Sequence, residues 1–212
     1  MDGVLGWDAT WTAELLGSRA ALDAALACDP TFATWTPMAA SNEARPINCL
    51  TWFAAQAFCV WDGGYLPTDA EWNAAAAGGD EQRALPWSVP AGSLVIDPSY
   101  ASYWSMETQC TGSANTGCDV EDLMRVGSRP AGNGRWGHAD LGGNVWEWVA
   151  DSYESVYPPT ACVDCALTSG RARSTRGGGF FDAVQGLRTG LRDAQEPEGR
   201  FGSRGARCAR GM

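Results

Sequence analysis

The chain has 212 residues, of which 45% are hydrophobic and 19% charged, with 26 glycines, 11 tryptophans and 8 cysteines. This composition is typical of one folded domain rich in turns, and it excludes disorder as the main state. All 15 basic residues are arginine and there is a single histidine, which excludes a Schiff-base enzyme, a phosphate-binding P-loop and a histidine-rich metal centre. The net charge of −10 disfavours a nucleic acid as partner.

Charge is unevenly distributed along the chain. Residues 171–212 hold nine arginines and four acidic residues, so the rest of the chain is strongly acidic. Opposite charges in two parts of one chain predict arginine–carboxylate pairs that tie the C-terminal segment to the body. A surface arginine patch that binds an anion is the alternative.

The first half of the chain predicts helices. Residues 10–27 are dominated by Ala and Leu, which predicts one or two short helices that end before Cys28. From Thr51 onward apolar residues recur at helical spacing, which places Cys59 on the buried face, and the pair Gly63-Gly64 is expected to end this helix.

A second helix is expected directly afterwards. Thr68, with Glu71 three residues later, has the pattern of a capping box and predicts a helix from Asp69 to about Ala77. The carboxylates at 69 and 71 are explained as first-turn residues near the positive end of the helix dipole. They are therefore not nominated as an acid–base pair.

The second half of the chain predicts strands. Residues 86–135 show little periodicity and are expected to form a long loop, pinned by disulfides, with one short strand at most. Residues 141–149 alternate between two faces, which is typical of a strand, and further strands are expected in 175–181 and 205–210. Helices early and strands late indicate an α+β fold rather than alternating α/β.

An even number of cysteines in a glycine-rich chain favours disulfide bonds and therefore an oxidising compartment. No run of 18 apolar residues could span a membrane, and the first residues do not form a signal peptide. We therefore expect an exported protein, whether periplasmic, a lipoprotein or extracellular, whose leader is absent from this chain. A cytosolic protein with structural thiols or a four-thiolate metal site is the alternative.

Four segments carry a family resemblance. They are Arg45–Trp52, Gly63–Trp72, Asp140–Trp148, and Arg176–Phe180 closing on Gly205–Ala209. The strings Leu-Pro-Thr-Asp-Ala-Glu-Trp and Gly-Asn-Val-Trp-Glu-Trp, about seventy residues apart, are the most specific. Together the segments resemble the formylglycine-generating enzyme, or sulfatase-modifying factor, family.

The resemblance implies the fold and the domain organisation. It predicts a single irregular α+β domain, the formylglycine-generating-enzyme variant of the C-type-lectin fold, with little regular secondary structure. The family-like domain is expected over 45–212. Residues 1–44 lack the opening motif that is usual in the family and are expected to be a truncated or divergent segment of the same domain.

The resemblance also implies a chemistry, which the sequence does not support. Active members oxidise a sulfatase cysteine to formylglycine with molecular oxygen and a copper ion held by two cysteines, since thiolates favour Cu(I). Asp182 and Leu187 occupy the corresponding positions here. We therefore expect no catalytic residues and no copper, and a non-catalytic binding or structural module. An active oxidase with displaced ligands is the alternative.

Calcium is the cofactor that the resemblance favours. In the family this segment binds Ca²⁺ through an Asn amide oxygen, a Glu carboxylate and a backbone carbonyl, which correspond to Asn144, Glu147 and Gly142, and such hard oxygen ligands suit the ion. In the alternative interpretation, Asn144 turns the chain and Glu147 pairs with an arginine. A second family calcium site would involve Ser102.

The resemblance matches Cys59 with Cys208 as a disulfide. By proximity in sequence the remaining cysteines are expected to pair as Cys28 with Cys49, Cys110 with Cys118, and Cys162 with Cys165. A zinc site formed by the four thiolates at 110, 118, 162 and 165 is the alternative.

Other candidate residues receive simpler interpretations. His138 is expected to be a loop residue, and Asp182 to pair with Arg188 or Arg192. Five tryptophans in or beside the family motifs are expected in the core, namely Trp52, Trp61, Trp72, Trp146 and Trp148. Four others are candidates for a ligand surface, namely Trp7, Trp35, Trp104 and Trp136.

The ligand itself is not identified by the sequence. A protein or a carbohydrate is expected as partner, because lectin-type folds present loops on a rigid base. A ligand-diversified binding protein, with its variable surface between Phe180 and Arg204, is a third possibility.

Overall fold

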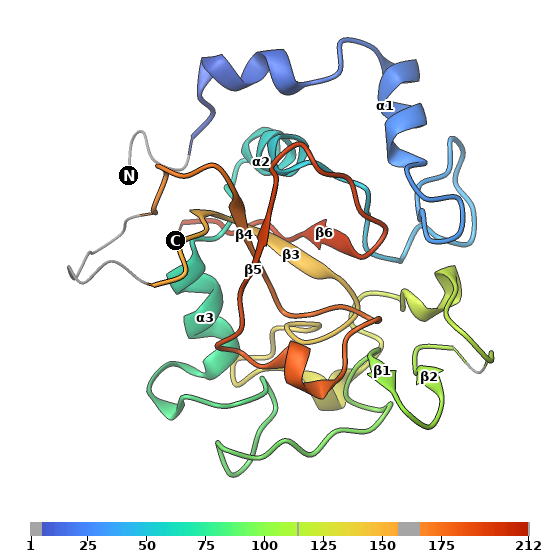
Figure 1. Cartoon of the computed structure of the whole chain (residues 1–212), viewed down its shortest axis with the longest axis vertical. Helices are drawn as coiled ribbons and strands as arrows, with labels where there is room; N and C mark the ends of the chain where they lie inside the picture. Colours follow the sequence, from blue (N-terminus) through green and yellow to red (C-terminus); the bar gives the residue numbers. More distant parts are fainter. Residues whose placement is uncertain (1–5, 114, 157–165, 212) are drawn as a thin grey trace.

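A four-stranded mixed sheet lies at the centre of the molecule, in the order β5-β4-β3-β6 (Figure 1). The computed structural model describes residues 6–113, 115–156 and 166–211. The strands of the sheet are β3 (Trp146–Ser152), β4 (Arg173–Arg176), β5 (Asp193–Gln195) and β6 (Arg204–Ala206). Strand β4 is antiparallel to β3 and to β5, whereas β6 is parallel to β3.

Helices α2 (Trp52–Trp61) and α3 (Asp69–Ala77) form where the sequence predicts them. The Thr68 side chain accepts from the backbone N–H of Glu71, whose carboxylate in turn accepts from the backbone N–H of Thr68. This capping box satisfies the free donors at the start of α3. At the other end Gly78, with φ of +71°, stops the helix in the left-handed conformation that glycine favours.

Helices α2 and α3 cover opposite faces of β3. Trp148 and Ala150 pack in one cluster with residues of α2. Val149, which points to the other face, packs with Trp72 and Ala76 of α3. Because both faces are covered, nearly the whole of β3 is buried. The alternation in its sequence therefore separates side chains that face α2 from side chains that face α3, and not buried side chains from exposed ones.

The N-terminal segment forms two short helices, as predicted. They are the 3₁₀ helix η1 (Ala9–Glu14) and the α-helix α1 (Arg19–Leu26). In Figure 1 this segment, in blue, passes over the side of α2 that faces away from the sheet. Trp11, Leu15 and Leu22 pack against the core cluster of α2, so the segment belongs to the same folded unit.

Between α3 and β3 the chain is mostly irregular. It contains the 3₁₀ helices η2 (Gly79–Glu81), η3 (Val120–Asp122) and η4 (Pro130–Gly132) and the strands β1 (Trp104–Ser105) and β2 (Gln109–Cys110). The two strands pair as an antiparallel hairpin, so this region holds one strand more than predicted. The low content of regular structure and the mixture of helix and sheet confirm the predicted α+β class.

Two strand predictions need correction at their ends. Strand β4 ends at Arg176 instead of continuing to 181, because Gly177 and Gly178 have φ of +93° and +69° and turn the chain. Strand β6 ends at Ala206, and an isolated bridge between Tyr65 and Ala209 continues the pairing.

Trp61 is not in the core, contrary to expectation. Its side chain is 80% exposed, while Phe58, three residues earlier, is 53% exposed. The two rings contact each other at a centroid distance of 5.8 Å. They lie on the side of α2 away from Ala55 and Cys59, which are buried, so the helix is apolar on both sides.

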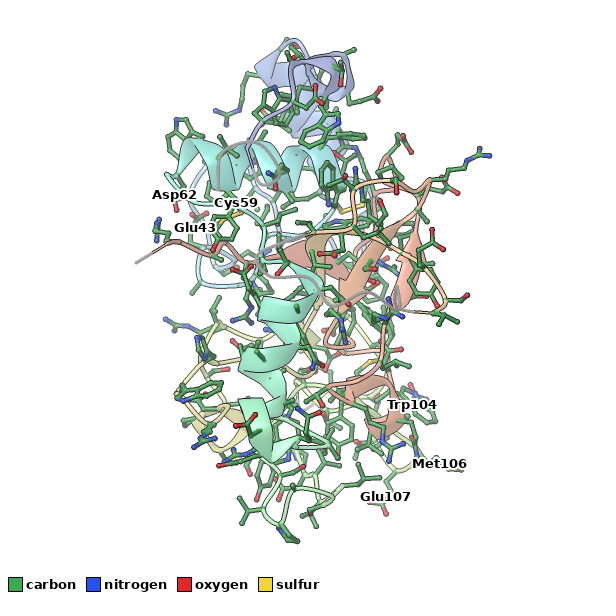
Figure 2. All side chains as sticks on the ribbon, turned by 90° about the vertical axis from the view of Figure 1, so that its left-hand side faces the viewer. Glu43, Cys59, Asp62, Trp104, Met106 and Glu107 are labelled. Carbon is green, nitrogen blue, oxygen red and sulfur yellow. A yellow bond between two sulfur atoms is a disulfide. The ribbon has the colours of Figure 1, made fainter. Side chains whose placement is uncertain are left out.

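Three disulfide bonds are present in the described residues. They join Cys28 to Cys49, Cys59 to Cys208, and Cys110 to Cys118. Figure 2 shows Cys59 on α2 in the upper half of the molecule and Trp104 in the lower half. Cys162 and Cys165, and with them the fourth predicted pair, lie outside the described residues.

Arginines of the C-terminal segment bind carboxylates of the body, as the charge distribution predicts. Salt bridges join Arg176 to Asp69, Arg207 to Glu147, and Arg210 to Asp62. The segment is thereby fixed to both helices and to β3. No helix in the described part of the chain has the length and apolarity needed to cross a bilayer.

Candidate functional site

The two positions that the resemblance assigns to copper ligands follow β4 in the chain. The loop that carries them starts with three glycines and continues into the 3₁₀ helix η5 (Val184–Leu187). A Cβ atom at Gly178 would lie 2.7 Å from the carbonyl oxygen of Gly186. A glycine is therefore required at 178 for the loop to pack against η5.

Asp182 has a structural role in this loop. Its Oδ2 atom accepts hydrogen bonds from Nε1 of Trp146, at 2.7 Å, and from the backbone N–H of Gly179, at 2.9 Å. The predicted pairing with Arg188 or Arg192 is wrong. The two groups that donate to the Asp182 carboxylate, the Trp146 indole and the Gly179 backbone, are both neutral. The carboxylate thereby fixes the loop to Trp146, the first residue of β3.

Leu187 is completely buried. It belongs to a cluster with Leu85, Trp87 and Tyr103. An aliphatic side chain has no lone pair, so it cannot bind a metal, and its burial in an apolar cluster leaves no space for one. The residues at the two positions therefore do not fit a copper ion.

Cysteines do not replace these ligands in the described part of the chain. All six cysteines there are in disulfides. The four-thiolate zinc alternative is wrong for the same reason, because Cys110 and Cys118 are bonded to each other. No group of three or more His, Cys, Asp or Glu side chains in the described ranges is arranged to hold a metal ion.

Comparison with known proteins identifies the family. The model of the sulfatase-modifying factor enzyme 1-like domain matches residues 11–212. The chain belongs to the formylglycine-generating enzyme family. The match extends through most of the N-terminal segment 1–44 that the sequence motifs left outside the resemblance.

Relatives of this chain include proteins named formylglycine-generating enzyme and proteins named inactive Cα-formylglycine-generating enzyme 2. The chain is 31% identical to the formylglycine-generating enzyme of Mus musculus over 178 residues, which is 78% of this chain and 44% of that protein. It is 29% identical to the inactive Cα-formylglycine-generating enzyme 2 of Bos taurus over 171 residues, covering 78% of this chain and 50% of the relative. The chain thus spans about half the length of these relatives.

Solved structures show the same fold. PvdO from Pseudomonas aeruginosa superposes with a TM-score of 0.63 at 21% identity, covering 80% of this chain and 63% of PvdO. This likeness confirms that the irregular α+β arrangement is that of the family.

Glu147, one of the predicted calcium ligands, is buried, and both of its carboxylate oxygens accept hydrogen bonds from other side chains. Its Oε2 atom accepts from Nε1 of Trp72 at 2.7 Å and from Nε of Arg207 at 2.6 Å, and its Oε1 atom accepts from Nη2 of Arg207 at 2.5 Å. Burial by itself lowers the pKa of Arg207, but the adjacent Glu147 carboxylate outweighs it and the pKa is raised. The carboxylate is thus neutralised by a bidentate guanidinium.

Asn144 is engaged as well. Its φ of +66° places it in the left-handed region, and its side-chain oxygen accepts from the backbone N–H of Met124 at 3.0 Å. Together with the Glu147–Arg207 pair, these contacts correspond to the turn-and-pair alternative. Asn144 and Glu147 thus have protein partners in this structure, and calcium binding by Asn144, Glu147 and the carbonyl of Gly142 stays a prediction.

The second predicted calcium residue, Ser102, is also buried, and its hydroxyl donates to the carbonyl oxygen of Asp122 at 2.6 Å. His138 is exposed in a loop, as expected.

Of the four tryptophans proposed for a ligand surface, Trp136 is the most exposed, at 54%, and the guanidinium of Arg135 lies 5.4 Å from its ring centroid. Trp104 and Trp35 pack against core clusters.

One candidate site was missed by the sequence reasoning. An apolar cavity lies between the N-terminal segment and α2, with Arg45 and Arg200 among its lining residues. The leucines of 10–27 predict helices, but their spacing does not indicate a cavity. The exposed Phe58 and Trp61, which depart from a single buried face, are the pattern that could have indicated a second apolar surface on α2.

Proposed function

We propose that this chain is a non-catalytic member of the formylglycine-generating enzyme family and acts as a binding or structural module. The observation that carries the proposal is the burial of Leu187 in an apolar cluster, at one of the two positions that the resemblance assigns to copper. A site that needs two soft ligands cannot form there.

The contacts of Asp182 support the same proposal. Its carboxylate is occupied by Trp146 and Gly179, so it holds the loop rather than presenting a free acid. Relatives named inactive formylglycine-generating enzyme 2 match this chain about as well as relatives named formylglycine-generating enzyme do. The alternative of an active oxidase with displaced ligands has no free cysteine to use in the described residues.

We further propose that the protein works in an oxidising, exported location. Three disulfide bonds in the described residues support this, because such bonds persist outside the reducing cytosol. The partner we propose is a protein or a carbohydrate, bound by loops on the rigid sheet and helices.

Activity is tested directly by incubating the protein with Cu(I), oxygen and a peptide of the sulfatase type, Cys-x-Pro-x-Arg. We expect the peptide mass to stay unchanged, while an active family member in the same buffer converts it. A mass loss corresponding to aldehyde formation would overturn the proposal. The double variant Asp182→Cys with Leu187→Cys tests the cause, since it should bind Cu(I) when the wild type does not.

A further inference from the structure

The apolar cavity beside α2 lies on a different part of the chain from the loop of Asp182 and Leu187. Its volume is about 530 Å³, within the range of roughly 300–1,000 Å³ that is typical of small-molecule sites. Much of its lining is aliphatic or aromatic, including Leu15, Leu22, Leu26 and Phe58. The cavity thus offers an apolar molecule contacts on several sides.

Two arginines of the lining have no carboxylate partner among the residues that the structure describes. Neither Arg45 nor Arg200 lies within 4.0 Å of an acidic oxygen of the described residues, whereas Arg176, Arg207 and Arg210 all do. Arg200 is half-buried, and burial lowers the pKa of its guanidinium. A partly desolvated cation without a counter-ion favours an anionic ligand group.

The two guanidinium groups are held in place by backbone carbonyls. Nη1 of Arg200 donates to the carbonyl oxygen of Cys49 at 2.9 Å. Nη1 of Arg45 donates to the carbonyl oxygens of Glu121 and Leu123, and its Nε donates to Oδ1 of Asn42 at 3.1 Å, which leaves Nη2 for a ligand. Each group therefore keeps a fixed position and retains further N–H donors for a ligand.

The acidic residues of the lining do not act as counter-ions to Arg45 and Arg200. Glu14 and Glu43 also line the cavity, but both are exposed, so their charges remain hydrated. In Figure 2, Glu43 lies in the same part of the molecule as Cys59 of α2 and Asp62, which directly follows this helix. Trp35 also lines the cavity, and its Nε1 atom is buried with no acceptor among the described residues.

We propose that this cavity binds an amphipathic organic anion, an aliphatic carboxylate whose chain lies against the leucines and Phe58 and whose head group meets Arg45 and Arg200. The apolar lining supplies affinity for the chain, and the two guanidinium groups, which have no carboxylate partner in the described residues, select a negative head. This inference does not depend on the absence of catalysis, since it concerns neither Asp182 nor Leu187.

Calorimetric titration of the intact protein with three ligands tests both halves of the proposal. The ligands are decanoate below its micellar concentration, neutral decanol, and acetate. We expect saturable binding of decanoate at one site, at least tenfold weaker binding of decanol, and none of acetate. Equal affinity for decanol and decanoate would overturn the role of the arginines, and absence of decanoate binding would overturn the whole proposal.

Variants locate the site. Arg200→Gln should weaken decanoate binding at least tenfold and leave decanol binding unchanged, and Arg45→Gln serves as a second variant if the first does not fold. Ala57→Trp, which fills the cavity, should weaken both ligands. The control Arg210→Gln removes the same charge at an exposed salt bridge outside the cavity and should leave binding unchanged. Unaltered decanoate binding in folded Ala57→Trp would place the ligand elsewhere and contradict the proposal.

Discussion

Asp69 and Arg176 form an ion pair in which both side chains are buried, with exposed fractions of 4% and 0%. Asp69 is the first residue of α3 and Arg176 the last of β4, 107 positions later in the chain. Arg176 also donates to the carbonyl oxygens of Thr189 and Leu191. One guanidinium thus joins a helix, the sheet and the loop that leads to β5.

Replacing Asp69 by Asn should destabilise the protein strongly. The substitution keeps the shape but removes the charge, and leaving Arg176 buried without its counter-ion costs about 3–5 kcal/mol by analogy with other buried pairs. Urea denaturation should show a lower midpoint with an unchanged slope.

A matched control is available on α1. Asp23 pairs with Arg19, whose side chain is 65% exposed, so Asp23→Asn should change stability by about 0.5 kcal/mol or less. Equal effects of the two substitutions would show that burial does not determine the importance of the Asp69 pair.

Local features of α3 were predictable from the sequence, but the partner of Asp69 was not. The capping box depends on residues three apart, so Thr68 and Glu71 suffice to predict it. The sequence explains Asp69 only as a first-turn residue near the helix dipole, because nothing local indicates a partner 107 positions away. That pairing arises only when β4 packs beside α3.

At the candidate sites too, contacts between residues distant in the sequence were not predictable. The motif around Glu147 predicted a calcium ligand, with an arginine partner as the alternative, and the choice depends on Arg207, sixty positions later. Trp61 was assigned to the core from its place beside a motif, yet helix geometry turns it to solvent. Phe58 and Trp61 could have indicated an apolar surface on α2, but the cavity also needs Arg45 and Arg200, which lie in segments that share no motif, so its enclosure was not predictable from the sequence.

The Cys59–Cys208 disulfide should contribute more stability than the Cys110–Cys118 disulfide. The first closes a loop of 149 positions and the second a loop of 8. In the chain-entropy model these loops correspond to about 5 and about 2.5 kcal/mol. Double Cys→Ser variants of each pair, compared by urea denaturation, measure the difference.

Non-reducing peptide mapping provides the companion measurement. We expect all eight cysteines to be oxidised, including the two outside the described residues. Equal destabilisation by both double variants would contradict the entropic account, and free thiols together with stoichiometric zinc would contradict the proposed oxidising compartment.

A bound calcium ion and the Glu147–Arg207 ion pair predict different effects of a chelator on the melting temperature of the protein. Since Arg207 already neutralises the carboxylate, EDTA should leave the melting temperature unchanged. Glu147→Gln should lower the free energy of unfolding by about 2–3 kcal/mol with or without Ca²⁺, because charged hydrogen bonds are lost.

Two results would favour the calcium prediction instead. One is a rise of several degrees in melting temperature with millimolar Ca²⁺ that Glu147→Gln abolishes. The other is a stoichiometric calcium ion in the purified protein, measured by mass spectrometry of the metal.

Asp140 should make stability depend on pH in a direction unusual for a carboxylate. Burial raises its pKa above the ordinary value, and repulsion from Glu147 adds to this, although the Gly127 N–H and Arg207 oppose it. A carboxyl with a raised folded pKa favours folding when it is protonated, so its contribution is full below about 3.8 and is lost as pH rises through the folded pKa. Asp140→Asn cannot ionise, so it should not lose stability as pH rises, and its amide oxygen can still accept the hydrogen bond from the backbone N–H of Gly127. Asn also tolerates the φ of +55° at this position.

The stability of Asp140→Asn relative to the wild type should therefore increase between pH 3 and pH 7. Asp97→Asn provides a control of opposite sign, because hydrogen bonds from the side chain and backbone of Ser99 lower the pKa of Asp97. Asp97 contributes stability above its unfolded pKa and loses it as pH falls, so this variant should become relatively less stable toward pH 7. Urea denaturation of the three proteins across this range measures both slopes. A difference between Asp140→Asn and the wild type that does not vary with pH would show that the environment of Asp140 does not alter its ionisation.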